Sequence, residues 1–423
     1  MPQKPTITLL NTDDFTGGAA IACKRLLKAL QQSDDVKPQM VVQTKKSHQN
    51  GIIALDTNWF ERKTSFVRLV LERLWFWPFE RSKAIRFQFN VGCFGRKIAN
   101  NQIIVNSDIV HLHWVNFGFL SVNSLRQLFK TNKPIVWTLH DMWAFTGGCH
   151  HSGTCQNYQI SCGNCVQFLK NLSDDDLSNQ VWQRKKEAFE GANLTIVTCS
   201  DWLGQRAKQS SLFKNLRVET IPNPIDIELF SPIPKSEART QLGLDPSKNY
   251  VLFAAMRVSA VGKGFLYFKE ALEILQKQNL DNTELLIFGQ SAGLESENLP
   301  FKINALGYLD SPNKIAMAYA AASMFVIPSL EENLPNTIME SLACGTPVVG
   351  FEVGGIPEMI DHQQNGYLAT YKSADSLAEG INWILQNTDY QKLCDNARQK
   401  VVDNYSESVV AKRYVALYES LIS

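Results

Sequence analysis

Short apolar runs recur along the chain, and longer stretches with helical spacing of their apolar positions separate them. A short apolar run bounded by turn-forming residues is typical of a strand buried on both faces, and helices between such strands are typical of a parallel sheet. The pattern therefore predicts an α/β fold. The predicted strands are residues 6–10, 108–113, 134–141, 194–200, 250–256, 285–289, 324–328 and 348–351.

Length and composition narrow the class of protein. A chain of 423 residues is long for one hydrophobic core and predicts two domains, with three as the alternative. The net charge of +1, from 42 basic and 41 acidic residues, gives no reason to propose nucleic acid as a partner. No apolar stretch is long enough to span a bilayer, and the run at 6–10 is too short for a signal peptide. Nine cysteines without a secretion signal indicate a reducing cytosol, so we expect a cytoplasmic protein.

The stretch Ser329 to Pro347 has the pattern of a loop followed by a helix. It comes directly after the predicted strand 324–328, and Pro335 suits the first turn of a helix. In open α/β sheets ligands bind at the C-terminal ends of the strands, where backbone N–H groups at a helix start can hold a phosphate. We therefore expect Asn336 and Thr337 to contact a phosphate group.

Two carboxylates flank this helix start. Glu332 lies in the loop and Glu340 in the second helical turn, so both can reach one ligand at separate points. The pair, followed by Ala343-Cys-Gly-Thr-Pro-Val-Val349, resembles the donor-site signature of the retaining glycosyltransferase family 4. An acidic pair on the surface before an ordinary helix is the alternative interpretation, and the residues around the pair favour the family.

The resemblance covers nearly the whole chain and implies the GT-B fold, with two Rossmann-like α/β/α domains whose parallel sheets face a central cleft. It implies that Glu340 holds the nucleotide ribose and that Glu332 contacts the donor sugar, with Leu334 among the donor contacts. The segment Val218 to Asp226 matches the family's hinge. The expected division is an acceptor-side domain at 1–222, a nucleotide-sugar domain at 223–404, and a helix at 405–423 that crosses back to the first domain.

The second domain offers cations for a diphosphate. Arg257 and Lys263 follow the strand 250–256, and a forked guanidinium with a point-charge ammonium suits a diphosphate leaving group. Their spacing matches the diphosphate-binding Arg and Lys of the family. Ala255 and Met256 depart from the family pattern, in which glycine often precedes the arginine.

The first domain begins as a strand, a Gly17-Gly18 turn and a helix. Glycine lets the backbone approach a ligand, although a tight turn explains the pair equally well. The dinucleotide fingerprint G-x-G-x-x-G is absent here, which counts against a dehydrogenase. The resemblance implies that this turn faces the donor phosphates and the acceptor across the cleft.

His140 ends the predicted strand 134–141, and the resemblance implies that it approaches the reacting sugar. His111 and His113 better suit a buried histidine that is hydrogen-bonded to backbone. No convincing pair of carboxylates for a covalent mechanism appears in the first domain, because Asp13 and Asp14 precede the glycine turn and Asp141 is expected to point away from His140.

Four cysteines lie in a loop rich in Gly, Ser and Asn at residues 147–166. Their spacing fits a structural zinc site with four thiolate ligands, for which His150 or His151 are substitutes. A reduced loop without metal and a catalytic thiol are the alternatives. A similar loop occurs in a subset of the family that assembles bacterial polysaccharides. The predicted ligands are Cys149, Cys155, Cys162 and Cys165.

Two further segments allow more than one interpretation. Asp174-Asp175-Asp176 contains a D-x-D pattern, but it stands before a helical stretch and is better explained as an N-cap with first-turn charges. Residues 59–90 are aromatic and basic, with about four more positive than negative side chains. Such a helix either lies on an anionic membrane or packs on the domain with snorkelling basic side chains.

The sequence thus predicts a retaining transferase that moves a hexose from a nucleoside diphosphate sugar, with UDP-glucose as the first candidate, to a glycan or lipid-linked glycan in envelope or exopolysaccharide synthesis. No cofactor is expected to be required for catalysis, and any zinc is structural. The alternatives are a GT-B nucleotide-sugar epimerase and a non-catalytic protein that binds sugar nucleotides.

Overall fold

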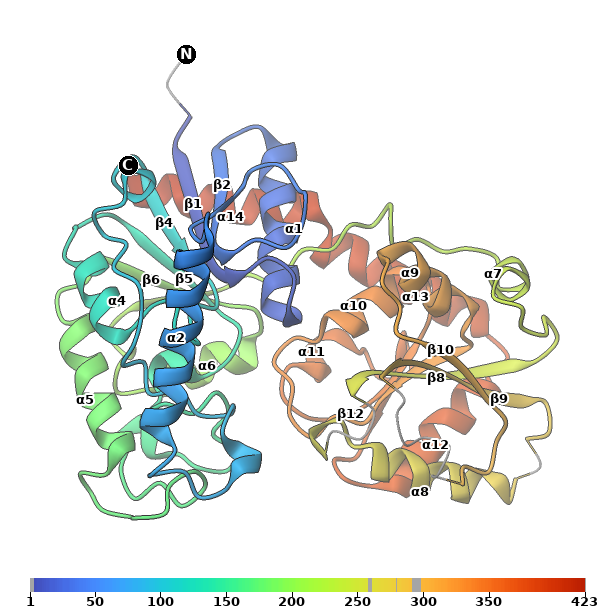
Figure 1. The fold of residues 1–423 in the computed structure, drawn as a ribbon. Helices are drawn as coiled ribbons and strands as arrows, with labels where there is room; N and C mark the ends of the chain where they lie inside the picture. The colour runs from blue at the N-terminus through green and yellow to red at the C-terminus, as the bar shows by residue number, and fades with distance from the viewer. Residues whose placement is uncertain (1–3, 258–260, 279, 291–297, 423) are drawn as a thin grey trace. The chain divides into compact units, whose positions relative to one another are not determined.

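The computed structural model describes residues 4–257, 261–278, 280–290 and 298–422. The chain divides into two compact units (Figure 1): Met1–Asn223 with Val410–Ser423, and Pro224–Val409. Each unit is built around one parallel sheet. Among the described residues, no helix combines the length and the apolar character that crossing a membrane requires.

The first unit contains a seven-stranded sheet in the order β3-β2-β1-β4-β5-β6-β7, and every pairing in it is parallel. The expected apolar runs form β1, β4, β5 and β6, whereas β2, β3 and β7 lie towards the edges and were not predicted. Its strands are β1 (Thr6–Asp13), β2 (Lys37–Thr44), β3 (Ile52–Ala54), β4 (Ile109–Leu112), β5 (Ile135–Leu139), β6 (Leu194–Thr198) and β7 (Arg217–Thr220).

Helices cover both faces of this sheet. One core joins the sheet to α4, α5 and α6 through residues such as Leu128, Phe189 and Leu203, and the other joins it to α1 and α14 through residues such as Leu26 and Tyr418. The last helix therefore packs into the core of the first unit. The helices are α1 (Gly17–Ser33), α2 (Trp59–Phe76), α3 (Gln102–Val105), α4 (Val122–Phe129), α5 (Leu177–Phe189), α6 (Asp201–Gln209) and α14 (Glu407–Ile422), with 3₁₀ turns at Lys83–Ile85, Trp143–Phe145 and Asn157–Gln159.

The acidic run before α5 is a helix cap, as predicted. Asp176 Oδ1 accepts hydrogen bonds from Ser178 N at 2.9 Å and from Asn179 N at 3.2 Å. These contacts satisfy two N–H groups at the helix start that would otherwise lack a partner.

The second unit contains a six-stranded parallel sheet in the order β10-β9-β8-β11-β12-β13. Its strands are β8 (Asn249–Arg257), β9 (Thr283–Gln290), β10 (Ile303–Gly307), β11 (Met324–Ile327), β12 (Val348–Phe351) and β13 (Gly366–Ala369). Its helices are α7 (Lys235–Gln241), α8 (Phe265–Gln276), α9 (Pro312–Ala321), α10 (Asn336–Ala343), α11 (Ile356–Met359), α12 (Ala374–Leu385) and α13 (Tyr390–Tyr405), with a 3₁₀ turn at Val261–Lys263.

The strand order of each sheet reverses at one point. In the first unit the chain runs from β1 out to β3 and returns to β4 beside β1, and in the second it runs from β8 out to β10 and returns to β11 beside β8. Connections leave such neighbouring strands in opposite directions, so a crevice opens at their C-terminal ends, where ligands bind. In the second unit the predicted donor residues lie at or after the ends of β8 and β11, on either side of the reversal; in the first unit Gly17 and Gly18 follow β1 at the reversal, and His140 follows β5, one strand beyond β4.

Candidate functional site

An ion pair lies at the β8/β11 reversal of the second unit. Lys263 Nζ donates a hydrogen bond to Glu332 Oε1 at 2.6 Å, and the Glu332 side chain is largely buried. Lys263 ends the turn after β8, and Glu332 belongs to the loop after β11. Two residues 69 positions apart are thereby held together at the C-terminal ends of the strands, where the sequence predicted the donor to bind.

Gly264 allows the segment that carries Lys263 to lie close to the segment that precedes Glu332. Its φ is +68°, and an added Cβ would lie 1.8 Å from the carbonyl oxygen of Pro328. A hydrogen bond from Leu330 N to Gly262 O at 2.9 Å ties the same two segments together. Gly354 contributes in the same way, because a Cβ there would lie 1.8 Å from Glu332 O. Backbone contact on both sides therefore fixes the loop that carries Glu332.

Helix α10 supplies the remaining donor candidates. Pro335 is the N-cap of this helix, whereas the sequence placed it in the first helical turn. Asn336 and Thr337 lie in the first turn and are half-buried. Glu340 is 9% exposed and Leu334 is buried. A carboxylate this enclosed is suited to accept charge-assisted hydrogen bonds from hydroxyl groups of a ligand.

Arg257 is the last residue of β8, and its side chain lies outside the described part of the structure, as do those of Ala255 and Met256. The predicted contact of its guanidinium with a diphosphate stays a prediction.

We expect Gly264→Ala to lower the melting temperature and to weaken UDP binding. The substitution adds the cost of a left-handed backbone, roughly 1 kcal/mol, to the displacement of the loop at Pro328. Gly262→Ala is the matched control, because a Cβ at Gly262 meets nothing within 4 Å. Thermal melting and UDP calorimetry of both variants measure the difference, and equal behaviour of the two would contradict the close-approach argument.

The glycine turn of the first unit follows β1, as predicted. Gly17 begins α1 with a φ of +84°, and Asp13 Oδ1 accepts hydrogen bonds from Phe15 N at 2.9 Å and Thr16 N at 2.6 Å, which shapes the turn. Gly18 continues into the first turn of α1. Helix α1 therefore begins at a residue whose positive φ favours glycine.

His140 follows β5 and is held by side chains. Its Nε2 shares a hydrogen bond with His113 Nδ1 at 3.0 Å, and its Nδ1 lies 3.6 Å from Cys199 Sγ. Desolvation by the surrounding protein lowers the pKa of His140 to about 4. The imidazole is therefore neutral near pH 7, and it can share a hydrogen bond without carrying charge.

The two histidines of the β4 segment are buried, as predicted, but their partners are not backbone atoms. His111 Nδ1 lies 2.7 Å from the Tyr418 hydroxyl, and its Nε2 lies 2.7 Å from Thr138 Oγ1. Burial lowers the pKa of His111 to about 3 and that of His113 well below its ordinary value. The expectation of backbone partners was wrong, because Tyr418 reaches β4 from α14, 307 positions away in the chain.

This histidine cluster gives a pH prediction. The folded-state pKa values of His111 and His140 lie below the ordinary value of 6.5, so between pH 6.5 and about 4 the unfolded chain binds more protons. Stability should therefore fall as the pH falls through this window, by about 1.4 kcal/mol per pH unit for each histidine. Urea unfolding against pH should show His140→Gln with a shallower slope than the parent, and equal slopes for the two proteins would contradict the prediction.

Asp141 points towards other protein groups. Its Oδ2 accepts hydrogen bonds from Trp114 Nε1 at 2.9 Å and His150 Nδ1 at 2.8 Å, and its Oδ1 accepts one from Trp143 N at 2.8 Å. Burial alone would raise its pKa, but His150 and these hydrogen bonds lower it to about 2. Sequence reasoning missed the roles of Trp114 and His150, because neither forms a motif with Asp141 at a fixed spacing.

The cysteine loop lies against the same part of the first unit. Among the residues that the structure describes, no group of three or more His, Cys, Asp or Glu side chains could hold a metal ion. Burial raises the pKa of Cys162 to about 12 and that of Cys165 to about 11, and it raises the pKa of Cys149 as well. Cys162 Sγ accepts a hydrogen bond from Gly147 N at 3.0 Å. The raised pKa values favour the protonated form of these three thiols, and the zinc site stays a prediction.

Elemental analysis of protein purified without metal-affinity resin tests that prediction. One zinc per chain is expected, and Cys162→Ser should lose the metal and melt at a lower temperature, because a structural zinc contributes directly to folding. Ile160→Ser, in the same loop and exposed, is the control. Absence of stoichiometric metal from the parent would leave the cysteines as packing residues only.

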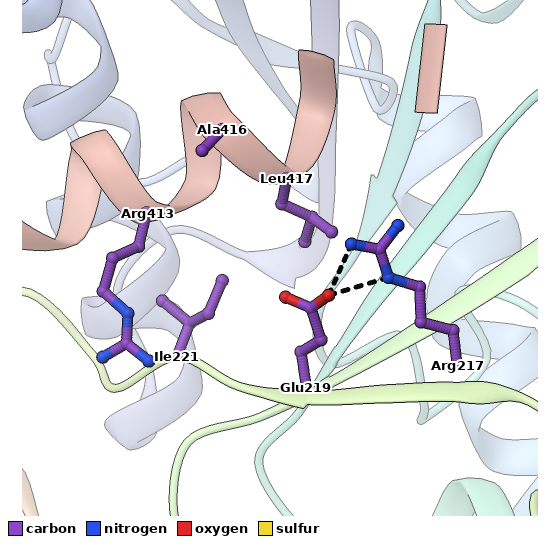
Figure 2. A pocket seen from close by; sticks show the side chains of 6 residues that line it. All are labelled: Arg217, Glu219, Ile221, Arg413, Ala416 and Leu417. Carbon is purple, nitrogen blue, oxygen red and sulfur yellow. Dashed lines mark hydrogen bonds and ion pairs between the residues drawn. The ribbon is translucent and has the colours of Figure 1, made fainter. Parts of the chain in front are cut away.

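A surface pocket of the first unit lies elsewhere, between β7 and α14 (Figure 2). Arg217 Nε donates to Glu219 Oε1 at 2.7 Å, and Arg413 donates to the carbonyl oxygen of Thr220. Its lining residues are Arg217, Glu219, Ile221, Arg413, Ala416 and Leu417. None of them is a predicted site residue, and their charged groups already bond to one another or to backbone. The candidate functional site is therefore placed at the C-terminal ends of the strands and not in this pocket.

Comparison with known proteins covers both units. Models of glycosyltransferase family 4 and of glycosyl transferases group 1 match residues 16–229 and 234–401. The D-inositol 3-phosphate glycosyltransferase of Segniliparus rotundus is 32% identical over 162 residues, which are 36% of this chain and 35% of that protein. The matched part thus spans about a third of the length of this relative.

Solved structures resemble the chain over its whole length. Sucrose-phosphate synthase from Thermosynechococcus elongatus gives a TM-score of 0.67 at 18% identity and covers 99% of both chains. Anabaena HepE in complex with UDP and glucose gives 0.63 at 15% identity, covering 98% of this chain and 100% of that one. These likenesses confirm the predicted fold class, two parallel-sheet α/β domains of the GT-B type.

Proposed function

Because the chain belongs to glycosyltransferase family 4, we propose that it transfers a sugar from a nucleoside diphosphate donor to a glycan or lipid-linked glycan acceptor. We assign the reaction to the cytoplasm and to cell-envelope or exopolysaccharide synthesis. The donor is bound by the second unit, with its diphosphate at Lys263 and at the start of α10. Arg257 is the second cation for the diphosphate.

The ion pair of Lys263 with Glu332 carries this proposal. It joins a cation suited to a diphosphate and a carboxylate suited to sugar hydroxyls at the C-terminal ends of β8 and β11. The distance from Lys263 Nζ to Glu332 Oε1 is 2.6 Å. Glu340, buried in the adjoining helix, supplies a second carboxylate for the ribose. A helix start between the two carboxylates provides N–H groups for phosphate oxygens.

A UDP-hexose is the proposed donor, with UDP-glucose as the first candidate. Support comes from Anabaena HepE, which shares the fold and whose structure contains UDP and glucose. No cofactor or divalent cation is assigned to catalysis, because the cationic side chains and helix start balance the charge of the leaving diphosphate. Activity that persists in EDTA is the expected result.

We further propose that the transfer retains the anomeric configuration without a covalent enzyme intermediate. Double displacement needs a carboxylate free to attack the sugar. Asp13, Asp14 and Asp141 each accept hydrogen bonds from neighbouring N–H groups, which argues against that role. The acceptor hydroxyl then attacks on the face that the diphosphate leaves and passes its proton to a diphosphate oxygen. His140 and Glu332 are the proposed catalytic residues.

Turnover of UDP-glucose with and without an acceptor glycan tests the function. Acceptor-dependent release of UDP supports transfer, conversion of the sugar nucleotide without acceptor would instead indicate an epimerase, and binding without turnover would indicate a non-catalytic protein. Proton NMR of the first product gives the anomeric coupling. A β product from the α-linked donor would overturn retention.

A further inference from the structure

Helix α2 turns its polar side towards the protein. Glu72 is fully buried, and its carboxylate accepts hydrogen bonds from the backbone N–H groups of Gly92 at 2.6 Å, Cys93 at 3.1 Å and Phe94 at 3.2 Å. Arg73 is buried beside it and donates to Phe89 O at 3.1 Å. Buried charged groups of this kind fix the rotation of the helix about its axis, because exposing that side would leave their partners unsatisfied.

The opposite side of α2 is apolar and faces solvent. Trp59 is 71% exposed, Phe66 61% and Trp75 52%, and the spacing of the exposed apolar positions follows the helical repeat. We define the outer face of α2 as Trp59, Phe60, Phe66, Val67, Leu71, Leu74, Trp75 and the helix-capping Trp77. A helix on the surface of a soluble domain normally has the reverse arrangement. A contiguous set of exposed, large apolar side chains on one side of a helix indicates a binding site for a partner or a membrane.

The sequence left open whether this helix lies on an anionic membrane or packs on the domain with snorkelling basic side chains. The structure shows that α2 packs on the domain through Phe76 and the buried Glu72 and Arg73, while most of its large apolar side chains face outward. The helix is labelled α2 in Figure 1, where it runs along the first unit.

The charges around this face have one sign. Within residues 57–90 the exposed charged side chains are all basic. The carboxylates are all bonded to protein groups: Glu61 accepts from Thr57 N at 2.7 Å, Glu72 accepts from the three backbone N–H groups described above, and Glu80 accepts from Arg86 Nε at 2.8 Å. The exposed basic residues are Arg62, Lys63, Arg81 and Lys83. An apolar, aromatic face rimmed by positive charge is complementary to an anionic surface with an apolar interior.

We propose that the outer face of α2 docks on the surface of an anionic lipid bilayer, with the helix in the plane of the membrane. Tryptophan and phenylalanine side chains then occupy the boundary between headgroups and acyl chains, and the basic side chains contact anionic headgroups. A second copy of the chain is disfavoured as the occupant, because pairing two such faces brings like charges together. The proposal rests on the geometry of the first unit and is independent of the transferase reaction.

Sedimentation of the full chain with vesicles, without sugar nucleotide or acceptor, tests the docking. The protein is expected to bind vesicles of phosphatidylcholine mixed with phosphatidylglycerol much more tightly than phosphatidylcholine alone, and added salt should weaken the binding. A Trp59→Ser, Phe66→Ser, Trp75→Ser variant should need at least about a hundredfold more lipid, since each buried side chain is worth roughly tenfold or more. Lys63→Gln and Lys83→Gln should each cost about fivefold.

Val105→Ser and Lys208→Gln, exposed residues of the first unit outside 59–90, are the matched controls and should bind like the parent. All these side chains are exposed, so unchanged melting temperatures verify that the variants are folded. Three results would overturn the proposal: no preference of the parent for anionic vesicles, unaltered binding by the triple variant, or dimerisation of the parent in solution that the triple variant abolishes.

Discussion

Replacement of Lys263 by alanine is expected to lower kcat by roughly 10²–10³-fold, the usual loss when a group that stabilises developing negative charge is removed. The ammonium lies at the end of the 3₁₀ turn after β8 and is held there by Glu332 at 2.6 Å. Negative charge develops on the diphosphate as it departs, so the ammonium stabilises the transition state more than the ground state, and the loss should appear in kcat more than in the binding of the intact donor.

A double-mutant cycle separates two roles of this lysine. If Lys263 serves only to hold Glu332, then Lys263→Ala, Glu332→Gln and the double variant should be equally impaired, and UDP should bind to all three alike. If it contacts the diphosphate, as we propose, Lys263→Ala should also weaken UDP binding in calorimetry, and Glu332→Gln should not. Lys269→Ala, on the neighbouring helix α8, is the control for loss of a positive charge. Unchanged kcat in Lys263→Ala would remove the diphosphate assignment.

Glu340→Ala is expected to weaken UDP binding about ten- to hundredfold. The carboxylate is 9% exposed in the second turn of α10, and we propose that it accepts hydrogen bonds from the ribose hydroxyls. Hydrogen bonds to a charged group of this kind contribute about 1.5–3 kcal/mol, which corresponds to the stated loss of affinity.

Isothermal calorimetry with UDP and with UMP measures this effect, and both ligands should lose affinity equally because both contain the ribose. Glu340→Gln keeps the shape and should lose less. Glu273→Ala removes an exposed carboxylate of α8 in the same unit and is the control. Parent-like affinity in a folded Glu340→Ala protein would show that the ribose is held elsewhere.

Local sequence patterns were sufficient for several features. The apolar runs that became β1, β4, β5, β6 and β11 are buried on both faces, and burial on both faces is what a continuous apolar run indicates. The N-cap at Asp176 and the turn at Gly17 depend on contacts within a few residues, so sequence spacing predicts them. The family signature at Glu332 and Glu340 also lies within one loop and one helix.

The strands β3 and β7 were not predicted because they form the edges of the sheet and bury few side chains, and Arg217–Thr220 in β7 carries a charged pair that a continuous apolar pattern excludes. Sequence reasoning assigned that segment to the linker, whereas it is the edge strand of the first sheet. Strand β2 buries Met40, Val41 and Val42, and this short apolar run was missed.

Tertiary structure alone decided which side of α2 faces solvent and which groups surround the histidines. Helical periodicity separates two sides of a helix but does not say which side is buried. In α2 the side that carries Glu72 is buried because the backbone around Gly92, distant in the chain, donates hydrogen bonds to its carboxylate. The partner of His111 is Tyr418, and the partner of Lys263 is Glu332, each contributed by a segment far along the chain. Hydrogen bonds between such segments depend on the folded sheet order, which no local pattern encodes.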